Sequence, residues 1–196
     1  NRDTSNNVRY KFGDNLSDAA RRLVARAPGP HGAPFDLVSA RIDARVGGGA
    51  AELADLALGA STVSGDALAE FLELMNERQL PVASNFVALA DVQAYAFRNV
   101  PLGARLETAL IRALLSRDDF GAAFARIERA VREGFIAPDV IAVLSREFVR
   151  ELSERAPDDV FLVHVLSYLD AGRPAGLGEA TATQAARRLL DLGLPD

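Results

Sequence analysis

The chain lacks cysteine altogether, and it has only two histidines among 196 residues. Without cysteine it has no disulfide framework, no thiolate zinc site, no iron–sulfur cluster and no cysteine nucleophile. Two imidazoles exclude any site that needs three of them from one chain. We predict no metal site and no cofactor.

Long hydrophobic runs and an excess of basic residues are also missing. No apolar segment approaches the roughly 20 residues that a membrane-spanning helix needs. The net charge of −5 argues against nucleic acid as a partner, because phosphate binding needs a basic surface. We therefore predict neither a direct membrane span nor a nucleic-acid partner. The oligomeric state stays open, and both a cytoplasmic and an exported location fit the sequence.

Lysine is almost absent, since Lys11 is the only one and arginine supplies the other 21 of the 22 basic residues. Codon bias in a GC-rich bacterial genome explains this ratio together with the abundance of alanine. The alternative is a toxin or injected effector that avoids lysine modification in a host cell.

Apolar residues at helical spacing dominate what is present. Hydrophobic residues make up 49% of the chain and charged residues 25%, which excludes an intrinsically disordered chain. Residues 1–14 are polar and aperiodic, so we expect a flexible leader there. From residue 15 the apolar period is interrupted only by glycine and proline, which predicts one all-helical repeat domain over 15–196. About ten helices are expected, near 17–27, 35–46, 50–58, 65–79, 83–98, 102–116, 118–133, 139–154, 158–170 and 178–192.

One segment of this pattern is rich in β-branched residues. Residues 160–166 are almost wholly apolar, which fits a buried strand as well as a buried helix. The preceding Pro157-Asp158-Asp159 is typical of a helix start, so a buried helix is favoured.

A spacing of 57 residues suggests an internal repeat. Pro81, Pro138 and Pro195 are separated by this distance, and each block between them holds three expected helices. Apolar positions also correspond between the blocks: Leu106 and Leu110 with Leu162 and Leu166, and Ala123 with Ala180. A helix pair cannot bury its apolar stripe alone, so it stacks on its neighbour to form an array.

The stretch SRDDFGAAFARIERAVREGFIAP, residues 116–138, resembles the second helix of a tetratricopeptide repeat and its approach. Phe120 has the aromatic position next to the turn. Ala123 and Ala130 correspond to the small residues where paired helices touch, and Ile127 to the large residue between them.

The preceding helix matches this family less well. Leu110 and Leu114 correspond to first-helix positions, but Leu114 replaces an aromatic residue, Ile111 replaces a small one, and Pro138 arrives about three residues late. The resemblance covers one helical hairpin. It implies a right-handed, tetratricopeptide-like α-solenoid of antiparallel helices that acts as a protein-binding scaffold.

Catalytic motifs are incomplete. Ser61 lies in Gly-Ala-Ser-Thr-Val, which lacks the second glycine and the preceding strand of a nucleophile elbow. Residues 176–181 begin like a dinucleotide fingerprint but lack its third glycine and the strand before it. His164 lies in the most apolar segment, where we expect a structural hydrogen bond to Ser167 or Tyr168. We predict no catalytic residue and no enzymatic activity.

Arginines are the best candidates for contact with a partner. Arg126, Arg129 and Arg132 recur every three residues on one expected helix, where interleaved Glu128 and Glu133 also fit a solvated, ion-paired face. We select Arg105, Arg112, Arg126 and Arg129 as contacts of a protein or peptide partner. The favoured function is a non-enzymatic scaffold or adaptor that binds through a concave helical face. A small-ligand effector domain of a regulator, and a helical accessory domain of a cell-wall enzyme or secreted effector, are the alternatives.

Overall fold

The structure is a computed structural model that describes residue 22, residues 32–171 and residues 177–194. These ranges are all-helical and contain no strand, so the predicted all-α class is confirmed for them. The expected leader 1–14 lies outside the described residues, and so does the expected helix 17–27 apart from residue 22. The sequence predicts one domain over 15–196, whereas the chain divides into two compact units between Glu77 and Arg78.

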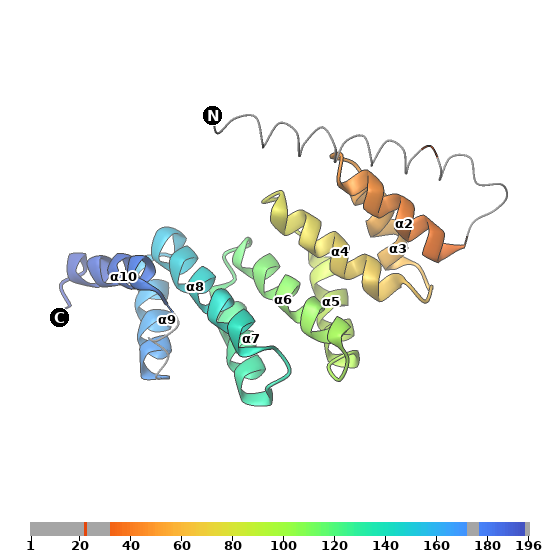
Figure 1. Cartoon of the computed structure of the whole chain (residues 1–196). Coiled ribbons are helices and arrows are strands. Elements are labelled where there is room, and N and C mark those ends of the chain that lie inside the picture. The colour runs from red at the N-terminus through yellow and green to blue at the C-terminus, as the bar shows by residue number, and fades with distance from the viewer. Residues whose placement is uncertain (1–21, 23–31, 172–176, 195–196) are drawn as a thin grey trace, which may run out of the picture. The chain divides into compact units, whose positions relative to one another are not determined.

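The first unit contains three described helices that pack on one another (Figure 1). They are α2 (Ala33–Ala44), α3 (Ala50–Leu58) and α4 (Ser64–Glu77). Leu53, Leu68 and Leu72 are almost completely buried between them. Arg41 Nε of α2 donates hydrogen bonds to both carboxylate oxygens of Glu70 on α4, each at 2.7 Å. The unit is therefore held by an apolar centre with an ion pair at its surface.

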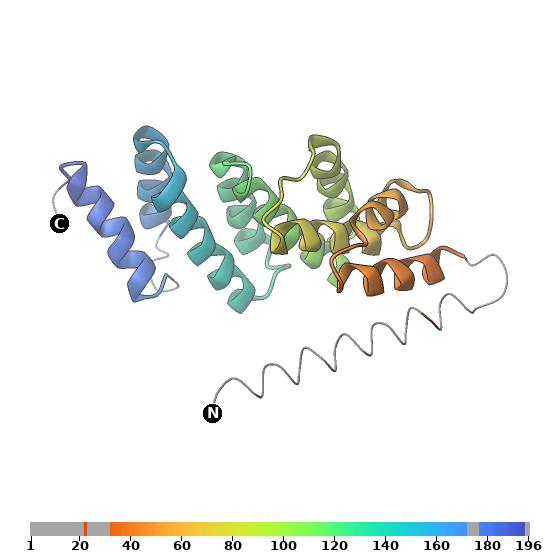
Figure 2. The same ribbon diagram turned by 90° about the horizontal axis from the view of Figure 1, so that it is seen from above.

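The second unit contains six described helices in two rows (Figures 1 and 2). Helix α8 packs against both α6 and α10, which makes one row, while α7 and α9 pack together in the other. Helix α5 packs against α6. The bounds are α5 (Ser84–Ala96), α6 (Pro101–Leu115), α7 (Phe120–Glu133), α8 (Pro138–Arg155), α9 (Asp158–Asp170) and α10 (Glu179–Asp191).

Helix ends lie within two residues of those expected from sequence, and backbone conformation explains the differences. Helix α4 stops at Glu77, short of the expected 79, because Gln79 has a positive φ of 53°. Helix α7 begins at Phe120 because Asp118 has a φ of 59° and the Asp119 side chain accepts a hydrogen bond from Ala122 N at 3.2 Å. It ends, as expected, at Gly134 in the left-handed conformation.

The residues of α7 that carry the family resemblance belong to the core of the second unit. Phe120, Ala123, Ile127 and Ala130 of α7 are all buried. Alanine at two of these positions lets the helix backbones approach, while the larger side chains fill the space beside them.

The 57-residue spacing does not pair equivalent environments. Leu106 and Leu110 are fully buried, whereas Leu166, the counterpart of Leu110, is 45% exposed. Ala123 is buried and its counterpart Ala180 is exposed. Blocks of three helices also place the matched helices in opposite rows, because the rows alternate with every helix. In the described part of this unit, consecutive helices from α6 to α10 alternate between the two rows.

Arg188 of α10 contacts α8 and α9 through hydrogen bonds, an ion pair and an aromatic ring. Its Nη1 donates to the carbonyl oxygens of Leu152 and Ser153 in the last turn of α8, at 2.9 Å each. The guanidinium also lies 4.4 Å from the centre of the Phe161 ring and pairs with Asp158 at 2.8 Å. A cation at a helix C-terminus satisfies carbonyls that have no partner within the helix.

Candidate functional site

Two of the four predicted contact arginines surround a buried carboxylate. Glu107 of α6 has no exposed surface. Arg126 Nη1 donates to its Oε2 at 2.8 Å, and Arg129 Nη2 donates to its Oε1 at 2.9 Å. Arg126 also pairs with Asp91 of α5. These arginines therefore join α5, α6 and α7 through acids on other helices.

The other two predicted arginines lie on α6. Arg112 forms a bidentate ion pair with Glu147 of α8, in which Nε and Nη2 donate to the two carboxylate oxygens at 2.8 and 3.1 Å. Arg105 is half-buried. Three of the four predicted contacts thus have internal acidic partners, and a carboxylate ligand would compete with those partners for the same donors.

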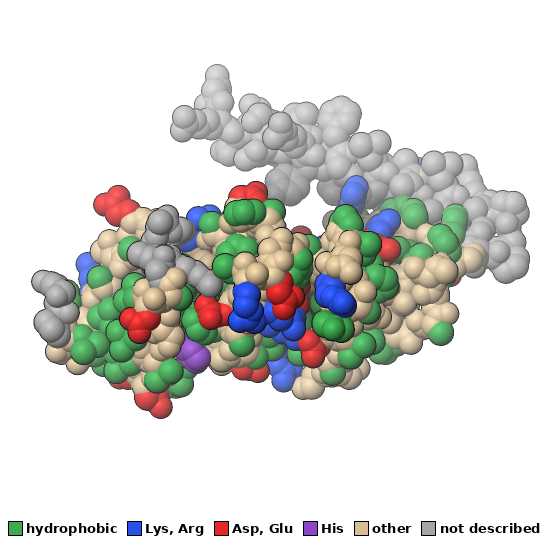
Figure 3. Space-filling model, turned by 90° about the horizontal axis from the view of Figure 1, so that it is seen from below, with side chains coloured by type: hydrophobic (Ala, Val, Ile, Leu, Met, Phe, Trp, Pro, Cys, Tyr) green, Lys and Arg blue, Asp and Glu red, His purple; other side chains and the backbone are tan. Residues whose placement is uncertain are grey.

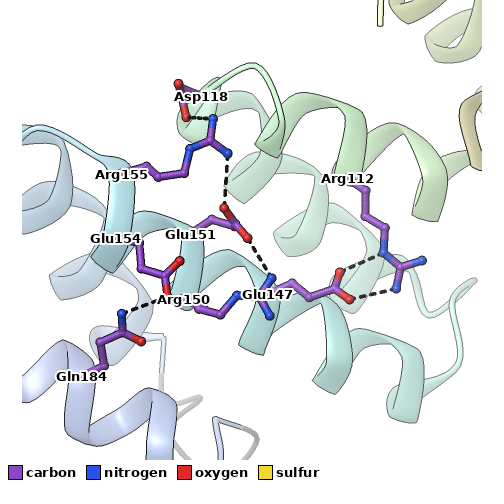
Figure 4. A network of polar contacts seen from close by, with 8 residues as sticks. All are labelled: Arg112, Asp118, Glu147, Arg150, Glu151, Glu154, Arg155 and Gln184. Carbon is purple, nitrogen blue, oxygen red and sulfur yellow. Dashed lines mark hydrogen bonds and ion pairs between the residues drawn. The ribbon is translucent and has the colours of Figure 1, made fainter. Parts of the chain in front are cut away.

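Figure 4 shows the polar contacts along α8, in which a group of ion pairs around Glu151 lies beside the Arg112–Glu147 pair. Arg155 pairs with Asp118 at 2.6 Å and with Glu151 at 3.2 Å, and Arg150 pairs with Glu151 at 2.7 Å. Burial raises the pKa of Glu151, but hydrogen bonds and positive charge from Arg150 and Arg155 together outweigh burial, so its pKa lies below the ordinary value. One face of α8 is therefore lined with ion pairs.

His164 of α9 packs among aromatic rings instead of forming the hydrogen bond expected from sequence. Its ring centroid lies 5.9 Å from Phe124 and 6.4 Å from Phe148, which is fully buried. The nearby Ser167 hydroxyl donates to the Val163 carbonyl oxygen at 2.7 Å. The hydrogen-bond expectation is corrected because a serine in a helix can bond to the backbone of its own preceding turn.

We expect the stability of the protein to depend on the protonation of His164. Burial lowers the pKa of this imidazole, so its folded-state pKa lies below the unfolded value of about 6.5. The neutral ring contributes stability that is fully present above the unfolded pKa and is lost as pH falls through the folded pKa. In thermal unfolding at about pH 7.5 and about pH 5.5, His164→Phe should lose less of its Tm on acidification than the wild type. An equal loss in both proteins would contradict this origin.

The exposed face of α9 is the feature that sequence reasoning missed. The segment 160–166 is helical, as favoured. Only one side of α9 is buried, and its buried residues are Phe161, Val165 and Tyr168. Val163 is 62% exposed, and Leu166 and Leu169 are 45% and 39% exposed. Hydrophobic side chains are visible over the C-terminal helices in the space-filling view (Figure 3). The sequence does contain a signal for this face: the apolar residues of α9 occur on all sides of the helix, whereas a helix with one buried side needs apolar residues on that side only.

A second exposed apolar face lies on α5. Val92 is 67% exposed and Tyr95 is 60% exposed. The guanidinium of Arg98 lies 4.3 Å from the centre of the Tyr95 ring, which covers part of that ring. The exposed apolar side chains of α9 are all aliphatic, and Leu166 lies three residues from both Val163 and Leu169 along the helix.

The two motifs weighed for chemistry lie at the N-terminal ends of helices. Ser61 precedes α4, and its carbonyl oxygen accepts a hydrogen bond from the Ser64 hydroxyl at 2.9 Å. Its own hydroxyl oxygen is buried and has no hydrogen-bond partner among the described residues. Gly178 precedes α10 directly, and no strand lies before it among the described residues. Within those residues, no three histidine, aspartate or glutamate side chains are grouped as metal ligands.

No described helix combines the length and hydropathy required to cross a membrane. We found no protein-family model, no curated protein and no solved structure that matches this chain.

Proposed function

We propose that the chain is a non-enzymatic helical-repeat scaffold that binds another protein or a peptide. The observation that carries the proposal is the exposed aliphatic face of α9, formed by Val163, Leu166 and Leu169. A soluble chain gains nothing in stability from keeping such side chains in water. Exposed apolar groups that gather on one surface are typical of a binding site.

Alternation of helices between two rows in the second unit supports a tetratricopeptide-like solenoid, which the family resemblance implies is right-handed. Its helices alternate between two rows, so each helix packs mainly on close neighbours in the chain. Such arrays present long, continuous helical faces on which an extended or helical ligand lies. Small buried residues at helix contacts, Ala123 and Ala130, agree with the packing of this family.

The predicted arginines are weaker contacts in this proposal than the α9 face. Arg112, Arg126 and Arg129 remain candidates for a carboxylate of the partner. Each of them would have to exchange an internal carboxylate for the new one, and burial of Glu107 makes that exchange costly for two of them. Apolar contacts on α9 require no such exchange.

The proposal is tested by selecting peptides from a random display library on the purified chain. We expect an enriched sequence family that binds the wild type. The variant Val163→Ser/Leu166→Ser should not enrich this family, because serine removes apolar contact from the exposed face. The matched control is Val38→Ser/Leu58→Ser, which alters side chains of similar exposure on α2 and α3.

Circular dichroism and thermal unfolding of both variants verify that the helices are intact, since exposed substitutions usually change stability by less than about 0.5 kcal/mol. Repeated selections without an enriched family would contradict the scaffold function. Equal enrichment on all three proteins would contradict the α9 face as its site.

A further inference from the structure

An aspartate lies at each end of the exposed face of α9. Asp159, Val163, Leu166 and Asp170 are separated by four, three and four residues, which aligns them in one stripe along the helix. Both aspartates are exposed. At a rise of about 1.5 Å per residue, they lie about 16 Å apart with the apolar side chains between them.

Nothing in the described part of the chain neutralises these two carboxylates. Helix α9 contains Asp158, Asp159 and Asp170 but no lysine or arginine. Asp158 pairs with Arg188, whereas Asp159 and Asp170 form no ion pair or hydrogen bond through their side chains with any described residue. Among the described residues, the stripe therefore combines an apolar centre with an unpaired carboxylate at each end.

Asp170 is the more informative of the two. Asp159 lies in the first turn of α9, where the helix dipole favours an acid. Asp170 is the last residue of the helix, where the exposed carbonyl groups make the same charge unfavourable. The helix itself thus explains the first aspartate but not the second. A cation bound beside Asp170 would be attracted by the carboxylate and by the carbonyl end of the helix.

We propose that the partner presents an amphipathic helix whose apolar side chains cover Val163 and Leu166 and whose flanking lysine or arginine side chains meet Asp159 and Asp170. This inference rests on the proposed scaffold function and specifies its partner. An apolar centre with charges at its rim is the usual arrangement of such interfaces, in which the rim charges select the partner and its register. Recognition of a helix uses anchors at this three-and-four spacing.

The same charges disfavour a second copy of this chain on the stripe. Two copies of α9 packed face to face would place aspartate against aspartate in both the parallel and the antiparallel arrangement. The net charge of −5 on each chain adds to that repulsion. A basic partner helix avoids both costs.

The test uses a fluorescein-labelled helical peptide of about 18 residues, or five turns. It carries three leucines on one face and arginines eleven positions apart at the ends of that face. A second peptide has glutamates in place of these arginines. Fluorescence anisotropy gives the Kd of each peptide for the full chain, and we expect the arginine peptide to bind at least about tenfold more tightly.

The decisive variant is Asp159→Arg/Asp170→Arg. It should bind the arginine peptide about tenfold more weakly than the wild type and prefer the glutamate peptide, because two attractions become two repulsions. The control Asp139→Arg/Asp191→Arg makes the same change of charge. Asp139 is the second residue of α8, as Asp159 is of α9, and Asp191 is the last residue of α10. This control should bind both peptides like the wild type.

Three results would overturn the proposal: equal affinity of the two peptides for the wild type, equal weakening by the two double variants, or a dimer of the free chain that Leu166→Ser dissociates. The last result would assign the stripe to a second copy. The library selection stands apart from these results. An enriched family that lacks basic ends would overturn the partner chemistry while supporting the scaffold function.

Discussion

Replacing Glu107 with alanine is expected to lower the free energy of unfolding by about 3 kcal/mol. The carboxylate is fully buried and accepts hydrogen bonds from Arg126 and Arg129, and the Arg126 side chain is only 14% exposed. Alanine would leave two guanidinium groups without that partner, and the one on Arg126 lies mostly out of water. It would also leave a cavity where three helices meet. Removing one member of a buried ion pair is far more damaging than its surface equivalent.

The matched control for this prediction is Glu147→Ala. Glu147 also pairs with an arginine through two hydrogen bonds, but both side chains are partly exposed, 26% for Glu147 and 38% for Arg112. Water can replace the lost partner there, so we expect a loss below about 1 kcal/mol. Urea unfolding monitored by circular dichroism measures both variants. If the two losses were equal, the buried carboxylate would have no special structural role.

Replacing Gly103 with alanine is expected to cost about 2 kcal/mol despite the better helix propensity of alanine. Gly103 lies in the first turn of α6, and the loop from α5 folds directly over it. A Cβ atom there would lie 2.2 Å from the Phe97 carbonyl oxygen and 2.5 Å from its carbonyl carbon. These are backbone atoms, so the loop itself must move. Overpacking of this kind costs up to about 3 kcal/mol, and propensity returns at most about 1 kcal/mol.

Gly121→Ala is the control for this substitution. Gly121 lies on α7, and a Cβ atom there would approach the His164 ring at 3.8 Å, an ordinary contact. Helix propensity then acts alone, and we expect a gain of up to about 1 kcal/mol. Thermal unfolding of the two variants should move Tm in opposite directions. A Gly103→Ala protein as stable as the wild type would contradict the close approach of the loop.

The helical elements were predictable because their signals are local. Glycine, proline and capping residues mark the ends of α3 and α9, whose bounds agree with the sequence pattern. Where a local conformation broke the pattern, as at Gln79 and Asp118 with positive φ, the predicted end moved by two residues. Residues other than glycine rarely adopt a positive φ, so the sequence pattern does not predict it at these two positions.

The site was less predictable because its features depend on distant contacts. Nothing near Glu107 in the sequence indicates that it becomes buried between Arg126 and Arg129, about 20 residues further along the chain. The apolar character of α9 was visible, but the side left exposed depends on which helices pack against it. Burial of Phe161, Val165 and Tyr168 by its neighbours decides that Val163 and Leu166 face solvent.

The measurement that tests the central claim most directly is methyl NMR of the chain during titration with a peptide enriched by the library selection. Isotope-labelled methyl groups of Val163, Leu166 and Leu169 report contact on the α9 face, and those of Val38 and Leu58 serve as exposed controls. The account predicts saturable shifts at the three α9 residues and none at the two controls. Shifts confined to other helices, with the α9 methyl groups unchanged, would contradict it.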